Sequence, residues 1–224
     1  MKCRVVAIGE CGLDKSGKNR VPMEIQKKYF EAQIDIAREL NLPLVLHIRG
    51  AEDEAKELLK KKKVPANFRI HYHCFTGTWK AAEAWLSAYP ASKIGLTGLV
   101  TFDHARSVHE VARHIPLEKL LLETDAPYFL PSGVSKKSYK HTFSQPGHVV
   151  HVAAQVGNIL KHFWPTDALG GCSEEDFLVR GAGREQEEYQ GYLRLLKAIF
   201  IQNQPLFVEM PLRMDHCEVC KFSS

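Results

Sequence analysis

Short runs of apolar residues alternate along the first 160 positions with longer segments of helical character. The clearest helical segment follows Pro22, where Ile25, Phe30 and Ile34 are among the apolar residues that recur at helical spacing. Thr78 is a suitable N-cap for a further helix. We expect helices at 22–40, 51–61, 78–85, 107–115 and 147–160. We expect strands at 5–9, 44–46, 68–72, 93–96 and 120–122.

This order of elements predicts an α/β protein with a mainly parallel sheet, because a crossover segment must connect each strand to the next parallel one. The strands are continuously apolar rather than alternating, which indicates a sheet that is buried on both faces. A closed β/α barrel and a doubly wound open sheet both satisfy this pattern. No GxGxxG sequence opens a helix, so the chain gives no support for a dinucleotide site.

The pattern changes after position 161. Residues 166–184 are rich in glycine and acidic side chains without a periodicity, and 210–224 show no recognisable pattern. We therefore expect a β/α portion at 1–161 and a divergent, partly helical C-terminal segment at 162–224. The chain has 224 residues, whereas a complete barrel of eight β/α units usually needs roughly 250.

Composition and charge narrow the possible functions only a little. The net charge of +4 permits a polyanionic partner without requiring one. The sequence contains no apolar run long enough for a membrane span and no pattern typical of a signal peptide. Six scattered cysteines are more typical of reduced thiols than of a disulfide framework, so we expect a nuclear or cytoplasmic protein.

Carboxylates and imidazoles stand at the ends of four of the five expected strands. These residues are Glu10, His47, His73 and Asp125. The carboxyl ends of the strands are where β/α barrels build their active sites. Two histidines and two carboxylates suit a transition metal such as Zn²⁺ or Mn²⁺ better than Mg²⁺, and two such ions about 4 Å apart suit phosphodiester hydrolysis.

Each of these residues alone has a simpler explanation, as a loop carboxylate, a core histidine or the start of a turn. Their shared position at successive strand ends favours a common metal site over four unrelated roles. His71 shares a strand face with His73 and competes with it for the same role.

Five short sequences resemble the motifs of the TatD family of metal-dependent deoxyribonucleases, in the same order and with the same spacing. They are GECGLD at 9–14, LHIR at 46–49, HCFTG at 73–77, IGLTG at 94–98 and ETDAPY at 123–128. The resemblance extends from position 5 to about 160 and is to a vertebrate member in particular. It implies a TIM-type barrel of the metal-dependent hydrolase kind.

The resemblance also implies an activity and a set of ligands. The family hydrolyses DNA phosphodiesters, often as a 3′–5′ exonuclease, with divalent ions such as Mg²⁺, Mn²⁺ or Zn²⁺. By resemblance, Glu10 bridges two ions, His47 and His73 complete the shell of one, and Asp125 belongs to the other. Glu10 and Asp125 are accordingly the expected catalytic residues.

One departure from the family pattern concerns the first metal. The family has a His-x-His pair on a strand upstream of the GExGLD motif, and the His71-Tyr72-His73 sequence of this chain matches the later motif instead. We therefore expect a barrel that is incomplete at its N-terminus and that holds one ion instead of two. A catalytically inactive fragment or splice form with a binding or regulatory role is the alternative to a nuclease.

Contacts to the substrate are predicted at two places. Arg49 follows His47 by two positions and is a candidate for a phosphate contact, although a surface loop arginine explains it equally well. Residues 135–141 form a basic loop suited to a phosphate backbone, so we expect DNA as the substrate. This loop disfavours a third interpretation, an amidohydrolase acting on small molecules, for which a carboxylated lysine at a strand end would also be expected.

Overall fold

The computed structural model describes residues 5–17, 19–132, 134 and 143–161. The predicted C-terminal segment at 162–224 and the predicted basic loop at 135–141 lie outside this part of the chain, and both stay predictions.

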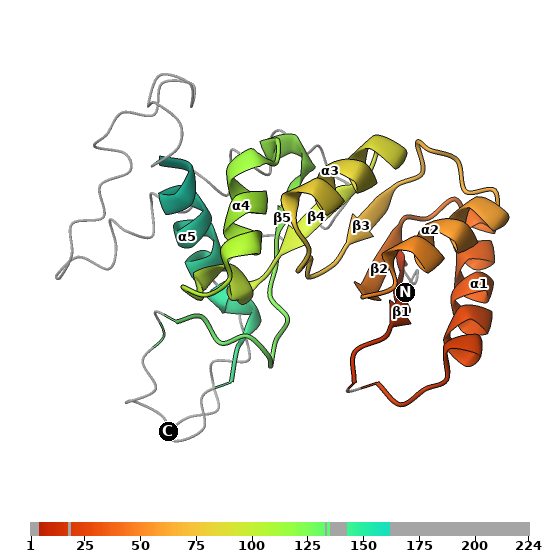
Figure 1. Cartoon of the computed structure of the whole chain (residues 1–224), viewed down its shortest axis with the longest axis horizontal. Helices are drawn as coiled ribbons and strands as arrows, with labels where there is room; N and C mark the ends of the chain where they lie inside the picture. Colours follow the sequence, from red (N-terminus) through yellow and green to blue (C-terminus); the bar gives the residue numbers. More distant parts are fainter. Residues whose placement is uncertain (1–4, 18, 133, 135–142, 162–224) are drawn as a thin grey trace, which may run out of the picture.

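Five strands alternate with helices through the described residues (Figure 1). The strands are β1 (Ile8–Asp14), β2 (Leu44–Arg49), β3 (Ile70–Tyr72), β4 (Lys93–Leu96) and β5 (Leu120–Leu122). The α-helices are α1 (Met23–Glu39), α2 (Glu52–Lys61), α3 (Trp79–Ala88), α4 (Arg106–His114) and α5 (Val149–Lys161). Three short 3-10 turns complete the elements: η1 (Gly98–Thr101), η2 (Leu117–Lys119) and η3 (Pro146–His148).

The sheet has the order β1-β2-β3-β4-β5, and every neighbouring pair is parallel. Figure 1 shows the same progression in space, from α1 and β1 on one side of the molecule to α5 on the other. A doubly wound sheet reverses its strand order at a switch point, whereas a barrel adds each strand next to the previous one. The uninterrupted order therefore identifies the fold as the predicted TIM-type barrel architecture.

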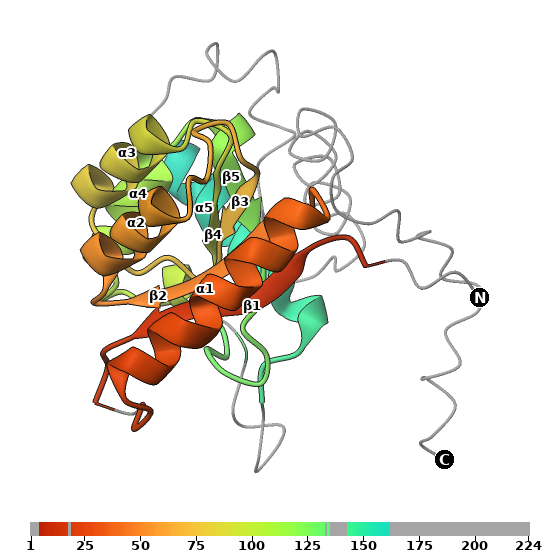
Figure 2. The ribbon, with the colours of Figure 1, turned by 90° about the vertical axis from the view of Figure 1, so that its right-hand side faces the viewer.

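Side chains alternate between the two faces of the sheet. In β2, Leu44, Leu46 and Ile48 are buried, and the residues between them are only partly buried. Figure 2 shows α2, α3 and α4 lying together on one side of the strands, which is the side that the buried residues line. The other face carries polar side chains and is half-buried among the described residues, so the expectation of a sheet buried on both faces was wrong.

Aromatic side chains fill the layer between sheet and helices. Trp85 of α3 packs against Tyr72 of β3 with the ring centroids 5.0 Å apart, and both are almost completely buried. The indole N–H of Trp85 donates a hydrogen bond to Ser92 Oγ at 3.2 Å, so burial leaves this polar atom satisfied. Within the described part of the chain, no helix combines the length and the apolarity that a bilayer crossing requires.

The predicted helices agree with the observed ones to within a few residues, and Thr78 caps α3 as expected by accepting a hydrogen bond from the Ala81 N–H. The first strand differs most from its prediction. It begins at Ile8 and continues to Asp14, because Cys11 to Asp14 pair with β2 after an irregularity in the register. Glu10 therefore lies inside a strand instead of after it.

Candidate metal centre

Glu10 is presented by a strand that lies unusually close to its neighbour. The register between β1 and β2 shifts after Ile8, in the segment that contains Glu10. Gly12 then pairs with His47 at a φ of +154°, and a Cβ at this position would overlap the His47 carbonyl oxygen. Only glycine permits this approach. The second glycine of the GExGLD motif thus holds β1 against β2, with Glu10 on the partly open face of the sheet.

His47 lies between two carboxylates of β1. Its Nδ1 is 3.5 Å from Glu10 Oε1, and its Nε2 is 3.5 Å from Asp14 Oδ2. The imidazole is on the same sheet face as Glu10, because the alternate residues Leu46 and Ile48 point into the helix-covered core. Both ring nitrogens of His47 therefore face acidic groups.

His73 comes directly after β3 and connects the remaining predicted residues. Its Nε2 lies 3.1 Å from Glu10 Oε1 and 3.5 Å from Asp125 Oδ1. Glu10 thus contacts both predicted histidines, and Asp125 enters the group through His73. The structure brings together the four side chains predicted as ligands, although they come from segments more than 100 positions apart.

Arg49, the predicted phosphate contact, stands at the end of β2 and is partly exposed. Its guanidinium donates a hydrogen bond to the Ile48 carbonyl oxygen at 3.0 Å. Its role as a substrate contact stays a prediction.

Besides Asp14, two further residues of the cluster were not among the predicted ligands: Glu123, and His71, which the sequence offered only as a competitor of His73. Glu123 Oε2 lies 2.8 Å from His73 Nδ1 and 2.8 Å from His71 Nε2. Its other oxygen accepts a hydrogen bond from the Cys74 N–H at 2.5 Å. The sequence held a signal for both, because each stands two positions before a predicted ligand and so shares its strand face.

The charges of this cluster shift several pKa values. Burial by itself would lower the pKa of His73, but the hydrogen bond and charge of Glu123, with Glu10 and Asp125 nearby, raise it to about 9. Burial would raise the pKa of Glu123, but hydrogen bonds from His71 and His73 lower it to about 2. The hydrogen bond from His47 lowers the pKa of Glu10. All three groups therefore favour their charged forms near neutral pH.

The cluster fits a divalent cation. His73 Nε2 faces carboxylate oxygens from two other segments, and a second imidazole reaches the same Glu10 oxygen. Mixed nitrogen and oxygen donors of this kind suit Zn²⁺ or Mn²⁺. His71, His73 and Glu123 form a second group of possible ligands, whose ligand atoms lie within 4.8 Å of one another.

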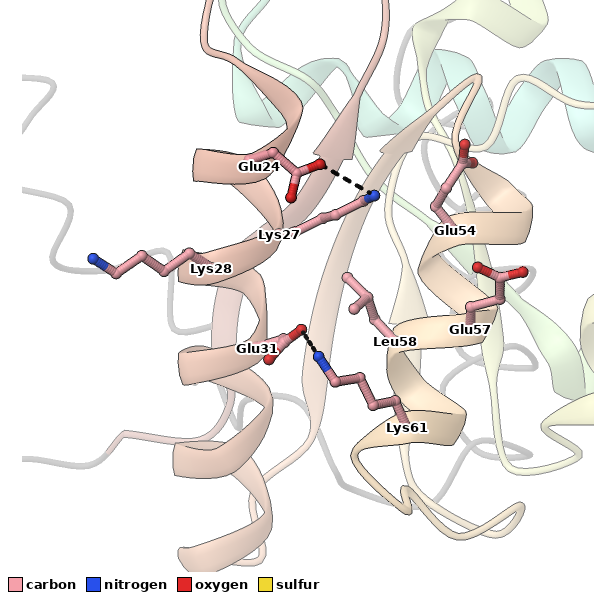
Figure 3. Close-up of a pocket in the computed structure, with 8 residues that line it drawn as sticks. All are labelled: Glu24, Lys27, Lys28, Glu31, Glu54, Glu57, Leu58 and Lys61. Carbon is pink, nitrogen blue, oxygen red and sulfur yellow. Dashed lines mark hydrogen bonds and ion pairs between the residues drawn. The ribbon is translucent and has the colours of Figure 1, made fainter.

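A hollow between α1 and α2 is a separate feature of the outer surface (Figure 3). Two of its lysines pair with its own glutamates, with Lys61 Nζ 2.8 Å from Glu31 and Lys27 Nζ 3.6 Å from Glu24, whereas Lys28 points away from them. The hollow shares no residue with the cluster around Glu10 and His73.

Comparisons with known proteins agree with the family resemblance. The human 3′-5′ RNA nuclease TATDN2 is 40% identical over 156 residues, which are 70% of this chain and 20% of that protein. YabD of Bacillus subtilis strain 168, an uncharacterized metal-dependent hydrolase, is 36% identical over 156 residues, covering 70% of this chain and 58% of that protein. This chain therefore spans between one fifth and three fifths of these two relatives.

A solved structure supports the same assignment. The crystal structure of YJJV, a TatD homologue from Escherichia coli K12, superposes with a TM-score of 0.62 and 28% identity, covering 90% of this chain and 65% of that one. The family model described as TatD related DNase matches residues 2–166. With both the ordered motifs and the barrel architecture in agreement, this chain belongs to the TatD-related DNase family.

Proposed function

We propose that this chain is a metal-dependent nuclease that hydrolyses phosphodiester bonds, acting on DNA from the 3′ end. The convergence of Glu10, His47, His73 and Asp125 from four segments of the sheet is the observation that carries the proposal. A polyanionic substrate is compatible with the net charge of +4.

Each residue has a proposed part in the reaction. Glu10, which contacts both imidazoles, would hold one divalent ion together with His47 and His73, and Asp125 would lie beside it, 3.5 Å from His73 Nε2. Bound divalent ions would polarise a phosphoryl oxygen and lower the pKa of water. Glu10 stays ionised near neutral pH, since its pKa is lowered, and can therefore serve as a metal ligand. Arg49 is the proposed contact to a substrate phosphate.

The choice between DNA and RNA is part of the proposal. The matching family model is described as a DNase, whereas the human relative is named an RNA nuclease. Both substrates share the phosphodiester group that the proposed site recognises. The test therefore compares both nucleic acids under the same conditions.

The experiment uses DNA and RNA oligonucleotides of one sequence, each labelled at either the 5′ or the 3′ end, incubated with Mn²⁺ and the purified chain. We expect progressive shortening from the 3′ end. Glu10→Gln and Asp125→Asn should lower the rate by at least about 100-fold. Glu57→Gln, on the exposed surface of α2, is the matched carboxylate control and should cleave at the rate of the unsubstituted chain.

Two results would contradict the proposal. Cleavage that persists in both the Glu10 and the Asp125 variants would show that another protein is responsible. Oligonucleotide binding by the unsubstituted chain without any cleavage would favour the alternative, a binding protein of the same family.

A further inference from the structure

His73 is held from two sides by different kinds of contact. Its Nε2 faces Glu10 and Asp125, where the proposed function places a metal. Its Nδ1 is 2.8 Å from Glu123 Oε2. A ring with one nitrogen bonded to a carboxylate is fixed in rotation, and its other nitrogen is left to bind a metal.

Glu123 is itself held firmly. Its Oε2 lies 2.8 Å from His71 Nε2 as well as from His73 Nδ1, and its Oε1 accepts the Cys74 N–H. The side chain is only 12% exposed. Both imidazole nitrogens lie in direct contact with the carboxylate, so this trio is connected without an ion. Two hydrogen bonds and the contact with the His71 imidazole thus fix the carboxylate, which cannot rotate away from His73 without losing them.

The sheet topology explains how these residues can meet. His71 belongs to β3 and Glu123 follows β5, so the strand β4 runs between them. Their side chains must therefore meet across β4, at the position of Gly95. A Cβ on Gly95 would overlap the Glu123 carboxylate and approach His71 Nε2 to 2.6 Å. The missing side chain of Gly95 is the space in which the two groups join.

We propose that Glu123, supported by His71 and seated over Gly95, is a positioning residue that holds His73 with Nδ1 protonated and Nε2 directed at the metal site. This inference rests on the proposed function for the identity of the Nε2 partner. It adds residues to the site that hold a ligand in place without binding the metal themselves.

The first test detects the hydrogen bond between His73 and Glu123 in the metal-free chain, by NMR of histidine side chains labelled with ¹⁵N. We expect the Nδ1 proton of His73 to exchange slowly with water and to lose this protection in Glu123→Gln. A His73 ring whose Nδ1 proton is not protected in the unsubstituted chain would overturn the proposal. This reading needs neither a metal nor a substrate, so its result is independent of whether the chain is a nuclease.

The second test measures Zn²⁺ affinity by calorimetric titration. Gly95→Ala keeps every ionisable group and every proposed ligand but displaces the Glu123 carboxylate, so we expect affinity to fall by about 10- to 100-fold, as in Glu123→Gln. Trp85→Phe is the control, because it perturbs the helix-covered core without touching this trio. It should lower the melting temperature and leave Zn²⁺ affinity unchanged.

Unchanged affinity in folded Gly95→Ala and Glu123→Gln would refute the positioning role. An equal loss in Trp85→Phe would refute it too, because general destabilisation would then explain the effect. If Gly95→Ala does not fold, the Zn²⁺ affinity of Glu123→Gln and the NMR measurement on the unsubstituted chain test the proposal instead. A chain that shows the His73–Glu123 hydrogen bond and binds Zn²⁺ but cleaves nothing would contradict the proposed function and support this inference.

Discussion

The ion pair between His73 and Glu123 should make the stability of the metal-free chain fall as the pH rises above neutrality. The pKa of His73 is raised from 6.5 to about 9 in the folded chain. The fold therefore holds this proton more tightly than the unfolded chain does. The resulting stabilisation is complete below about pH 6.5 and is lost as the pH rises through about 9.

The size of the effect follows from the pKa difference. Each pKa unit corresponds to about 1.4 kcal/mol, so the shift of His73 from 6.5 to about 9 contributes at most about 3.5 kcal/mol to the free energy of unfolding. The imidazole side chain is only 14% exposed, so solvent screens little of this energy. The lowered pKa of Glu123 reports the same interaction from the other side, and the two contributions are not added.

Urea unfolding in the presence of a chelator measures this contribution, at about pH 6 and about pH 9.5. We expect the unsubstituted chain to lose up to about 3.5 kcal/mol more between these values than Glu123→Gln loses. Other groups that titrate in this range are the same in both chains, so their effect cancels in the comparison. An equal pH dependence in the two chains would refute the argument.

Three further results are expected. Thr78→Ala removes the hydrogen bond to the Ala81 N–H and should lower the free energy of unfolding by about 1 kcal/mol in urea titration, with Thr78→Ser close to unchanged. Trp85→Ala leaves a cavity beside Tyr72 and should cost about 3–5 kcal/mol by the same assay, and a loss below about 1 kcal/mol would contradict the packing described. Mn²⁺ affinity, measured by calorimetry, should rise between about pH 6 and 9, because His73 must lose a proton to bind the metal and its pKa is raised to about 9. A Mn²⁺ affinity that falls over this pH range would contradict His73 as a ligand.

Much of the fold was predictable because the order of local elements determines it. Each strand is short and apolar, and each is followed by a helix, which is sufficient to predict a parallel sheet. The sequence alone did not distinguish a closed barrel from a doubly wound open sheet. Strand order decides that choice, and strand order depends on pairing between segments that are distant in sequence.

The convergence of the four proposed ligands was predictable for a related reason. Parallel strands present their carboxyl ends at one edge, so residues at those ends meet whichever helices separate them. His73 and Asp125 follow their strands as expected. Glu10 and His47 instead lie within longer strands, because the close pairing at Gly12 extends β1 and β2 beyond their apolar cores.

The support beneath the ligands was not predicted, because it depends on three strands at once. His71 and Glu123 are separated by 52 positions, and a glycine on the strand between them admits their contact. When each strand is considered alone, His71 and Glu123 have simple local explanations, and Gly95 does not differ from other glycines in strands. His71 and Glu123 each stand two positions before a proposed ligand, His73 or Asp125, and form a supporting layer on the same face of the sheet. A ligand held by such a layer keeps its orientation before any ion arrives, so removing a residue from the layer should weaken metal binding even though every ligand remains.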